Sequence, residues 1–322
     1  MSASTEISPS IKIVDTLPSL ISFLDDLNSA LTISTCTSTL YLSITPRNTA
    51  TPYVLIIHWI LPHLPGTPQN SETYLLDFTA ISTEILMNTH SSNKSLTMMQ
   101  YTHAPPPGQA HQAETPEYIS LKTLFESPYI SKILFDVRDI SHFLYTKCDI
   151  SLAGVKDIQL MELAVRAGGK DKLRGLAKCV ELHSPLPSAV KKEWEAKRTA
   201  LQKIEIRTRG QRPMEPEVMQ YYALSVDMLP RVYDVLRKKL EPGNESFWRS
   251  HVEAETNERI KEAKNPQYNM QEQGRVYSPW NDDYVEAAID GWNDDVLAQA
   301  SEEAEAEYDR LDDYLQEMRM TT

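Results

Sequence analysis

The sequence predicts an α/β protein in which helices flank a mixed central sheet and further helices extend the C-terminus. Two patterns lead to this fold class. Three successive segments, 39–45, 53–61 and 73–81, are apolar or alternate in the manner of strands, and Pro-, Asn- and Thr-rich turns join them as in an antiparallel meander. Residues 132–182 then follow the order strand, helix, strand, helix, which is typical of an α/β unit. Such units place functional side chains where strands end and helices begin.

The segments before the α/β unit add one strand, one helix and a loop. Residues 11–14 alternate like a first strand, and Leu17 and Pro18 begin an amphipathic helix that ends near Asn28. Residues 88–117 are polar and contain three successive prolines, so we expect a loop inserted into the domain here. Within the α/β unit we predict a strand at 133–135, a helix at 138–147, a strand at 155–158, a helix at 159–166 and a basic helix at 171–182.

Helices dominate the prediction after the α/β unit. A long helix begins at Pro213 or Pro216 and runs to Leu240, and Pro230 should bend it or mark a junction. In the sequence, a basic helix at 189–203 and a basic turn at 207–212 precede this long helix. A charged helix at 245–264, an irregular stretch at 265–280 and an acidic helix at 284–318 follow it. We therefore divide the chain into a flexible N-terminus (1–10), one domain (11–240), a helical extension (241–280) and an acidic helical tail (281–322).

Charge is distributed unevenly along the chain. The net charge is −13, but residues 281–322 alone carry fourteen Asp/Glu against two Arg, a net of −12, which leaves about −1 for the first 280 residues. Residues 164–213 carry thirteen Lys/Arg against five Asp/Glu, a net of +8. The chain thus combines a basic segment, which could attract a polyanion, with an acidic tail.

Cysteine usage and hydropathy favour an intracellular protein, cytoplasmic or nuclear. Cys36, Cys148 and Cys179 lie far apart, which argues against a disulfide framework or a zinc ribbon. The longest apolar run, 54–61, is too short to cross a bilayer, and the first residues show no secretory signal. We therefore expect no membrane association.

Several segments together resemble the 3′–5′ exonuclease domain of the Asp-Glu-Asp-Asp (DEDD) superfamily, in its ribonuclease D-like branch. The resemblance is collinear from about residue 11 to 240, and the order and spacing of its segments carry it. These segments are 11–27, 74–77 (YLLD), 121–128 (LKTLFESP), 133–144 (ILFDVRDISHFL), 154–164 (GVKDIQLMELA), 173–182 (LRGLAKCVEL) and 212–233 (RPMEPEVMQYYALSVDMLPRVY). The resemblance implies a ribonuclease H-like fold and hydrolysis by two Mg²⁺ or Mn²⁺ ions that four carboxylates hold.

The positions that the resemblance assigns to the four carboxylates hold other residues. Ser43 and Thr45 stand in place of the Asp-x-Glu pair on the first central strand, and His142 stands in place of the third carboxylate. The fourth position, four residues after Tyr221, is Ser225. Tyr221 matches the tyrosine that orients water in the family. Because Mg²⁺ and Mn²⁺ require carboxylate oxygens, these residues predict a degenerate site and no metal cofactor.

Three functions follow as alternatives. The preferred one is a catalytically degenerate exonuclease fold that binds single-stranded RNA or DNA. The residues expected to contact phosphates are Lys170, Lys172, Arg174, Lys178, Lys191, Lys192, Lys197, Arg198, Arg207, Arg209 and Arg212. An active 3′–5′ exonuclease would need Mg²⁺ or Mn²⁺ as its cofactor. The last alternative is a scaffold that binds a protein partner through the acidic tail.

Overall fold

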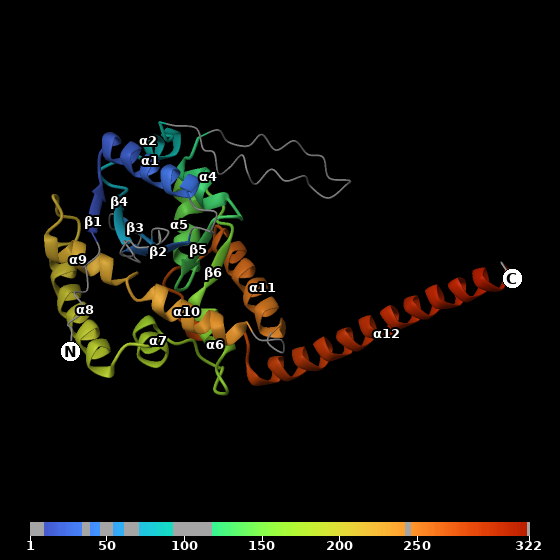
Figure 1. Ribbon diagram of the computed structural model, residues 1–322. Coiled ribbons are helices and arrows are strands. Elements are labelled where there is room, and N and C mark those ends of the chain that lie inside the picture. Colours follow the sequence, from blue (N-terminus) through green and yellow to red (C-terminus); the bar gives the residue numbers. More distant parts are fainter. Residues whose placement is uncertain are drawn as a thin grey trace, which may run out of the picture.

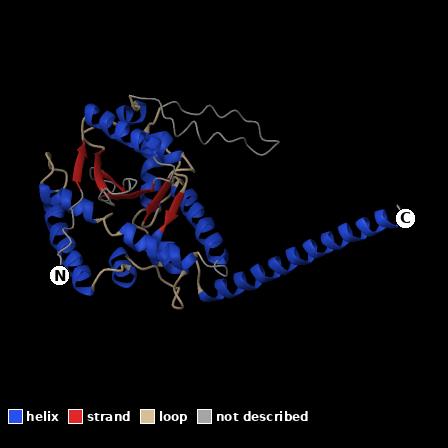
Figure 2. Cartoon of the chain, viewed as in Figure 1, coloured by secondary structure: helices blue, strands red, loops and turns tan. Residues whose placement is uncertain are grey.

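A six-stranded mixed sheet lies at the centre of the protein, with helices on both faces (Figure 2), as the sequence predicts. The computed structural model describes residues 10–33, 39–45, 54–60, 71–92, 118–241 and 246–320. The predicted flexible N-terminus up to residue 9, and residues 93–117 of the predicted loop, lie outside the described residues. None of the described helices is long and apolar enough to cross a membrane.

The sheet contains the predicted antiparallel meander, and its pairing pattern shows at which edge each strand ends. Its strands lie in the order β1 (Ser10–Val14), β4 (Ser71–Asp77), β3 (Val54–Ile60), β2 (Thr39–Thr45), β5 (Ser131–Leu134) and β6 (Val155–Asp157). β3 pairs antiparallel with β2 and β4, whereas β1 is parallel to β4, and β5 is parallel to β2 and β6. β3 thus runs against the other five strands, whose carboxyl ends share one edge of the sheet.

Two apolar cores cover the two faces of the sheet (Figure 1). On one face lie α1 (Leu17–Ile33), α2 (Thr83–Asn88), α4 (Leu121–Glu126) and α5 (Arg138–Cys148). On the other lie α6 (Ile158–Ala164), α7 (Leu176–His183), α8 (Ser188–Thr208), α9 (Pro216–Leu224) and α10 (Leu229–Leu240). The alternation of β2 explains this division, because Leu40 and Leu42 enter the first core and Tyr41 enters the second.

The C-terminal helices close the β6 edge of the sheet and then leave it. α11 (Ser246–Ala263) packs against β6, α5 and α6, so that Ile260 joins the first core and Val252 the second. A short 3₁₀ helix, η2 (Gln273–Val276), follows. The long helix α12 (Asp282–Met320) extends away from the body (Figure 1).

Four predicted helices differ from the structure. The helix predicted to end near Asn28 continues to Ile33 as α1, and the basic helix predicted at 189–203 continues to Thr208 as α8, so Arg207 is helical and does not lie in the predicted turn. The basic helix predicted at 171–182 begins only at Leu176, because the residues before it pair with residues 276–278: Lys172 forms a β-bridge with Tyr277. The long helix predicted up to Leu240 is divided into α9 and α10 by turns at 225–228. Pro230 lies in the first turn of α10, where its missing N–H costs little, so the predicted junction is confirmed.

Candidate functional site

Three buried aspartates lie where strands end at the shared carboxyl edge of the sheet. Asp77 is the last residue of β4, Asp157 is the last residue of β6, and Asp136 follows two residues after β5. Their exposed fractions are 1%, 0% and 9%. A buried carboxylate is stable only where hydrogen bonds or a counter-charge offset its lost hydration. The partners of these three groups therefore decide what this edge can do.

Asp157 organises the turn after β5 and the start of α6. Its carboxylate accepts hydrogen bonds from the backbone N–H groups of Asp136 (3.0 Å), Val137 (3.2 Å) and Gln159 (2.9 Å). The bond from Gln159 caps α6, and the other two hold Asp136 in a left-handed conformation with φ 64°. Arg259 of α11, itself 2% exposed, supplies the counter-charge at 2.8 Å.

Asp136 and Asp139 are paired with arginines in the same way. The Arg138 guanidinium donates to both oxygens of Asp136, at 2.7 and 3.0 Å. Arg275 of η2 lies 3.4 Å from Asp136 and 2.6 Å from Asp139, whose carboxylate also accepts from the Tyr268 hydroxyl at 3.1 Å. The aspartates at this end of the edge are thus bound to arginines that the α5 turn, α11 and η2 provide.

Asp77 has a separate partner at the other end of the edge. Its carboxylate forms an ion pair with Arg212, which precedes α9, and accepts from the Thr79 backbone N–H (3.0 Å) and hydroxyl (2.6 Å). Burial raises the pKa of Asp77, but the hydrogen bonds from Arg212 and Thr79 outweigh burial and lower the pKa overall. Each strand-end aspartate therefore already has a guanidinium counter-ion.

The residues at the four positions where the resemblance implies carboxylates do not form a metal centre. Ser43 and Thr45 are half-buried on the face of β2 that α10 covers, because Tyr41 on the same face packs against Tyr233. His142 lies on α5, where its Nδ1 is 2.8 Å from the Ala263 carbonyl oxygen.

Ser225 and Tyr221 have local roles. The Ser225 hydroxyl donates to the Tyr222 carbonyl at 2.6 Å at the end of α9, and the half-buried Tyr221 ring lies 5.9 Å from the Tyr222 ring. Among all described residues, no group of three or more His, Cys, Asp or Glu side chains is arranged to hold a metal ion. The donor set at these positions does not fit two divalent cations, which require several carboxylate oxygens.

The structure divides the predicted phosphate-binding residues into buried, paired and exposed groups. Lys170 must be corrected: its side chain is 7% exposed, its Nζ donates to the carbonyls of Leu163 (2.5 Å) and Ala164 (3.0 Å), and it lies over the Trp248 ring. Such a group stabilises the end of α6 and is inaccessible to a phosphate.

Six further basic residues already have protein partners. Arg174 pairs with Glu162 at 2.6 Å, Arg209 pairs with Glu205 at 2.7 Å, and Arg212 pairs with Asp77. The other pairs are Lys178 with Glu181, Arg198 with Glu195 at 3.7 Å, and Lys191 with the backbone carbonyls of Glu181 and Ser184.

The remaining basic side chains gather mainly on the solvent side of α8. Lys192, Lys203 and Arg207 are exposed, and their spacing of eleven and four residues places them on one side of the helix. We call these three residues the α8 basic stripe. Lys197 is exposed on the same helix, whereas Arg198 is half-buried over the Trp194 ring beside its partner Glu195, and Lys172 is exposed elsewhere. Lys203 was missed in the sequence prediction, although its spacing from Lys192 and Arg207 was the signal that could have found it.

One antiparallel strand lies among five parallel ones, and helices cover both faces of the sheet, which is the arrangement of the ribonuclease H-like fold. Comparison with solved structures agrees. The chain is similar to Trypanosoma brucei RNase D in complex with RNA U12, at 14% identity and a TM-score of 0.55, covering 88% of this chain and 80% of that one. RNase D of the same organism without RNA gives a TM-score of 0.54, also at 14% identity, covering 88% and 82%.

These likenesses confirm the predicted fold. No protein-family model and no curated protein matches the sequence. The activity of this chain must therefore be argued from its own side chains.

Proposed function

We propose that this protein binds single-stranded RNA or DNA through the α8 basic stripe and does not hydrolyse it by a two-metal mechanism. The observation that carries the proposal is the contrast between the two candidate sites. The strand-end aspartates are occupied by arginines, whereas Lys192, Lys203 and Arg207 are exposed and form no ion pair with any described acidic residue.

The chemistry of the strand edge argues against hydrolysis. Two-metal catalysis needs carboxylates with free oxygens to hold the ions, and Ser43, Thr45, His142 and Ser225 offer none. Arg259 and Arg275 cannot replace a metal, because a guanidinium stays protonated and does not lower the pKa of water as a metal ion does. The protein would therefore keep the exonuclease scaffold and lack its catalyst.

The α8 stripe suits a phosphate backbone. Lysine and arginine side chains on one exposed helix face neutralise successive phosphates and release counter-ions, which gives a salt-dependent, sequence-tolerant affinity. RNA is the first choice because a similar structure is the RNase D complex with RNA U12. The exposed Lys197 would extend the contact along α8.

The test is fluorescence anisotropy of a 5′-labelled oligouridylate with the full chain, over a range of salt concentrations. The triple variant Lys192→Ala, Lys203→Ala, Arg207→Ala should weaken binding by about tenfold or more near 50 mM salt. Because each phosphate contact to a single strand contributes ~0.7 to the log–log salt slope, losing three contacts should reduce that slope by about 2. A matched variant that removes three exposed lysines elsewhere, Lys147, Lys238 and Lys261, should retain most of the affinity. Absence of binding at low salt, or equal effects of the two variants, would reject the α8 interface.

The same oligonucleotide tests for catalysis. Incubation with Mg²⁺ or Mn²⁺, with EDTA as the control, should leave its length unchanged. Shortening from the 3′ end that EDTA stops, and that His142→Ala abolishes, would instead establish an active exonuclease. Binding and cleavage are measured on one substrate, so each part of the proposal can fail separately.

A further inference from the structure

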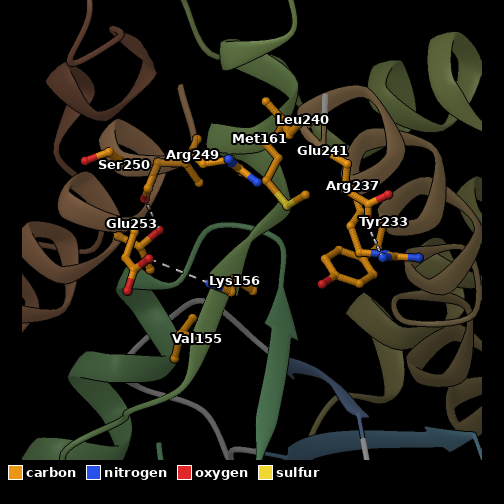
Figure 3. A pocket seen from close by; sticks show the side chains of 12 residues that line it. Val155, Lys156, Met161, Tyr233, Arg237, Leu240, Glu241, Arg249, Ser250 and Glu253 are labelled. Atoms are coloured by element: carbon orange, nitrogen blue, oxygen red, sulfur yellow. Dashed lines mark hydrogen bonds and ion pairs between the residues drawn. The ribbon is translucent and has the colours of Figure 1, made fainter. Parts of the chain in front are cut away.

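A cavity of about 310 Å³ lies between β6, α6, α10 and α11 (Figure 3). It contains none of the strand-end aspartates and no residue of α8. Its volume is at the lower end of the range of small-molecule sites, so it could hold one small organic molecule. Neither the resemblance nor the proposed nucleic-acid contact uses this cavity.

Three cationic side chains from three different elements line the cavity. Lys156 comes from β6, Arg237 from α10 and Arg249 from α11. Lys156 is 4.0 Å from Glu253, and Arg237 pairs with Glu241. Arg249 differs from both, because the described part of the chain gives it no hydrogen-bond or ion-pair partner. Figure 3 shows its side chain reaching across the cavity toward Met161.

The wall that Arg249 faces is apolar and partly aromatic. The Met161 side chain is 4% exposed, and the half-buried Tyr233 lies on the opposite side of the cavity beside Arg237 (Figure 3). A tyrosine ring and a thioether both form favourable contacts with a planar ring. Val155, Leu240 and Val252 complete the apolar lining.

We propose that this cavity binds a nucleoside 5′-monophosphate. The unpaired guanidinium fork of Arg249 matches a phosphate group, which guanidinium groups bind through paired hydrogen bonds, and Arg237 adds positive charge on the opposite side of the cavity. The base lies against Tyr233 and Met161. The carboxylates of Glu241 and Glu253 at the rim accept hydrogen bonds from sugar hydroxyls or a base amino group, which a simple phosphate or fatty acid does not offer in this combination.

Isothermal titration calorimetry of the full chain with AMP tests this proposal, with adenosine and inorganic phosphate as comparison ligands. AMP should bind at one site per chain. Each comparison ligand should bind more weakly than AMP by a factor of about ten or more, because adenosine lacks the phosphate and inorganic phosphate lacks the nucleoside. Arg249→Ala removes an exposed, unpaired side chain, so the fold should be retained and AMP affinity should fall by about tenfold or more. Tyr233→Leu should reduce the affinity for AMP but leave that for phosphate unchanged.

The α8 triple variant is the matched control, because it removes three cations away from the cavity. It should bind AMP like the unmodified chain, whereas Arg249→Ala should bind the oligonucleotide normally. Phosphate binding as tightly as AMP, or AMP affinity that is unaffected by Arg249→Ala, would overturn the proposal. Neither outcome bears on nucleic-acid binding by α8.

Discussion

Replacing Arg259 by methionine should destabilise the protein by about 3 to 5 kcal/mol at neutral pH, because it leaves buried carboxylates without their counter-charge. Arg259 is 2% exposed and Asp157 is fully buried, with 2.8 Å between Nη1 and Oδ2. The same guanidinium also donates to Gln159 at 3.1 Å and lies 3.9 Å from Asp136. Methionine fills much of the volume, so lost charge pairing dominates the effect. Urea unfolding followed by circular dichroism measures it.

The double variant Arg259→Met, Asp157→Asn is the control. Because it removes both charges of the pair, its cost should be less than the sum of the two single costs by about 1 to 3 kcal/mol. The side-chain amide that replaces the carboxylate would still accept from the Asp136 and Gln159 N–H groups through its oxygen, but would lose the bond from Val137, which donates to the other oxygen. Strictly additive costs, or a loss below about 1 kcal/mol for Arg259→Met, would show that the ion pair is not what holds α11 to the sheet.

Three further predictions concern other parts of the fold. Burial raises the pKa of Asp227 to about 7 despite a 3.0 Å hydrogen bond from Trp194, so the folded state holds a proton that the unfolded state releases near pH 4. The free energy of unfolding, relative to that of Asp227→Asn, should therefore fall by at most ~4 kcal/mol between about pH 4 and 7. Denaturant unfolding at several pH values measures this change. Gly154→Ala should cost more than about 2 kcal/mol in the same assay, because φ is +64° and a Cβ would lie 2.9 Å from the Ile130 and Pro128 carbonyl oxygens. Millimolar Mg²⁺ or Mn²⁺ should not raise the melting temperature in differential scanning fluorimetry; a concentration-dependent rise would reveal a bound ion.

The sheet could be predicted from the sequence because its signals are local. Alternation in 39–45 and the apolar run from residue 54 report strand burial directly, and both strands form as expected. The start of the basic helix could not be predicted, because residues 171–173 pair with residues about a hundred positions later. The Leu173 N–H donates to the Val276 carbonyl at 2.9 Å, and this tertiary contact overrides helical propensity.

The partners of the strand-end aspartates could not be predicted for the same reason. Asp136 and Asp157 lie in the segments 133–144 and 154–164, whose sequences resemble the exonuclease domain. Their partners Arg259 and Arg275 lie more than a hundred residues away, and no local sequence pattern marks them. Likewise, the sequence around Lys170 gives no sign that its side chain is buried over the Trp248 ring. Composition revealed the basic segment, whereas only tertiary structure distinguishes its paired charges from its exposed ones.

The distribution of the arginines also bears on the extension predicted at 241–280. Residues 246–280 supply Arg259 and Arg275 to the carboxyl edge, and Trp280, which is 2% exposed, joins the second core with Trp248. Without them, Asp157 and Asp139 would lose their arginine partners at the edge, and each uncompensated buried carboxylate costs several kcal/mol. That loss is comparable with the entire stability of a typical domain. The extension therefore supplies Arg259 and Arg275, two of the cations that the carboxyl edge of this sheet requires, and the ribonuclease H-like fold of this chain depends on it.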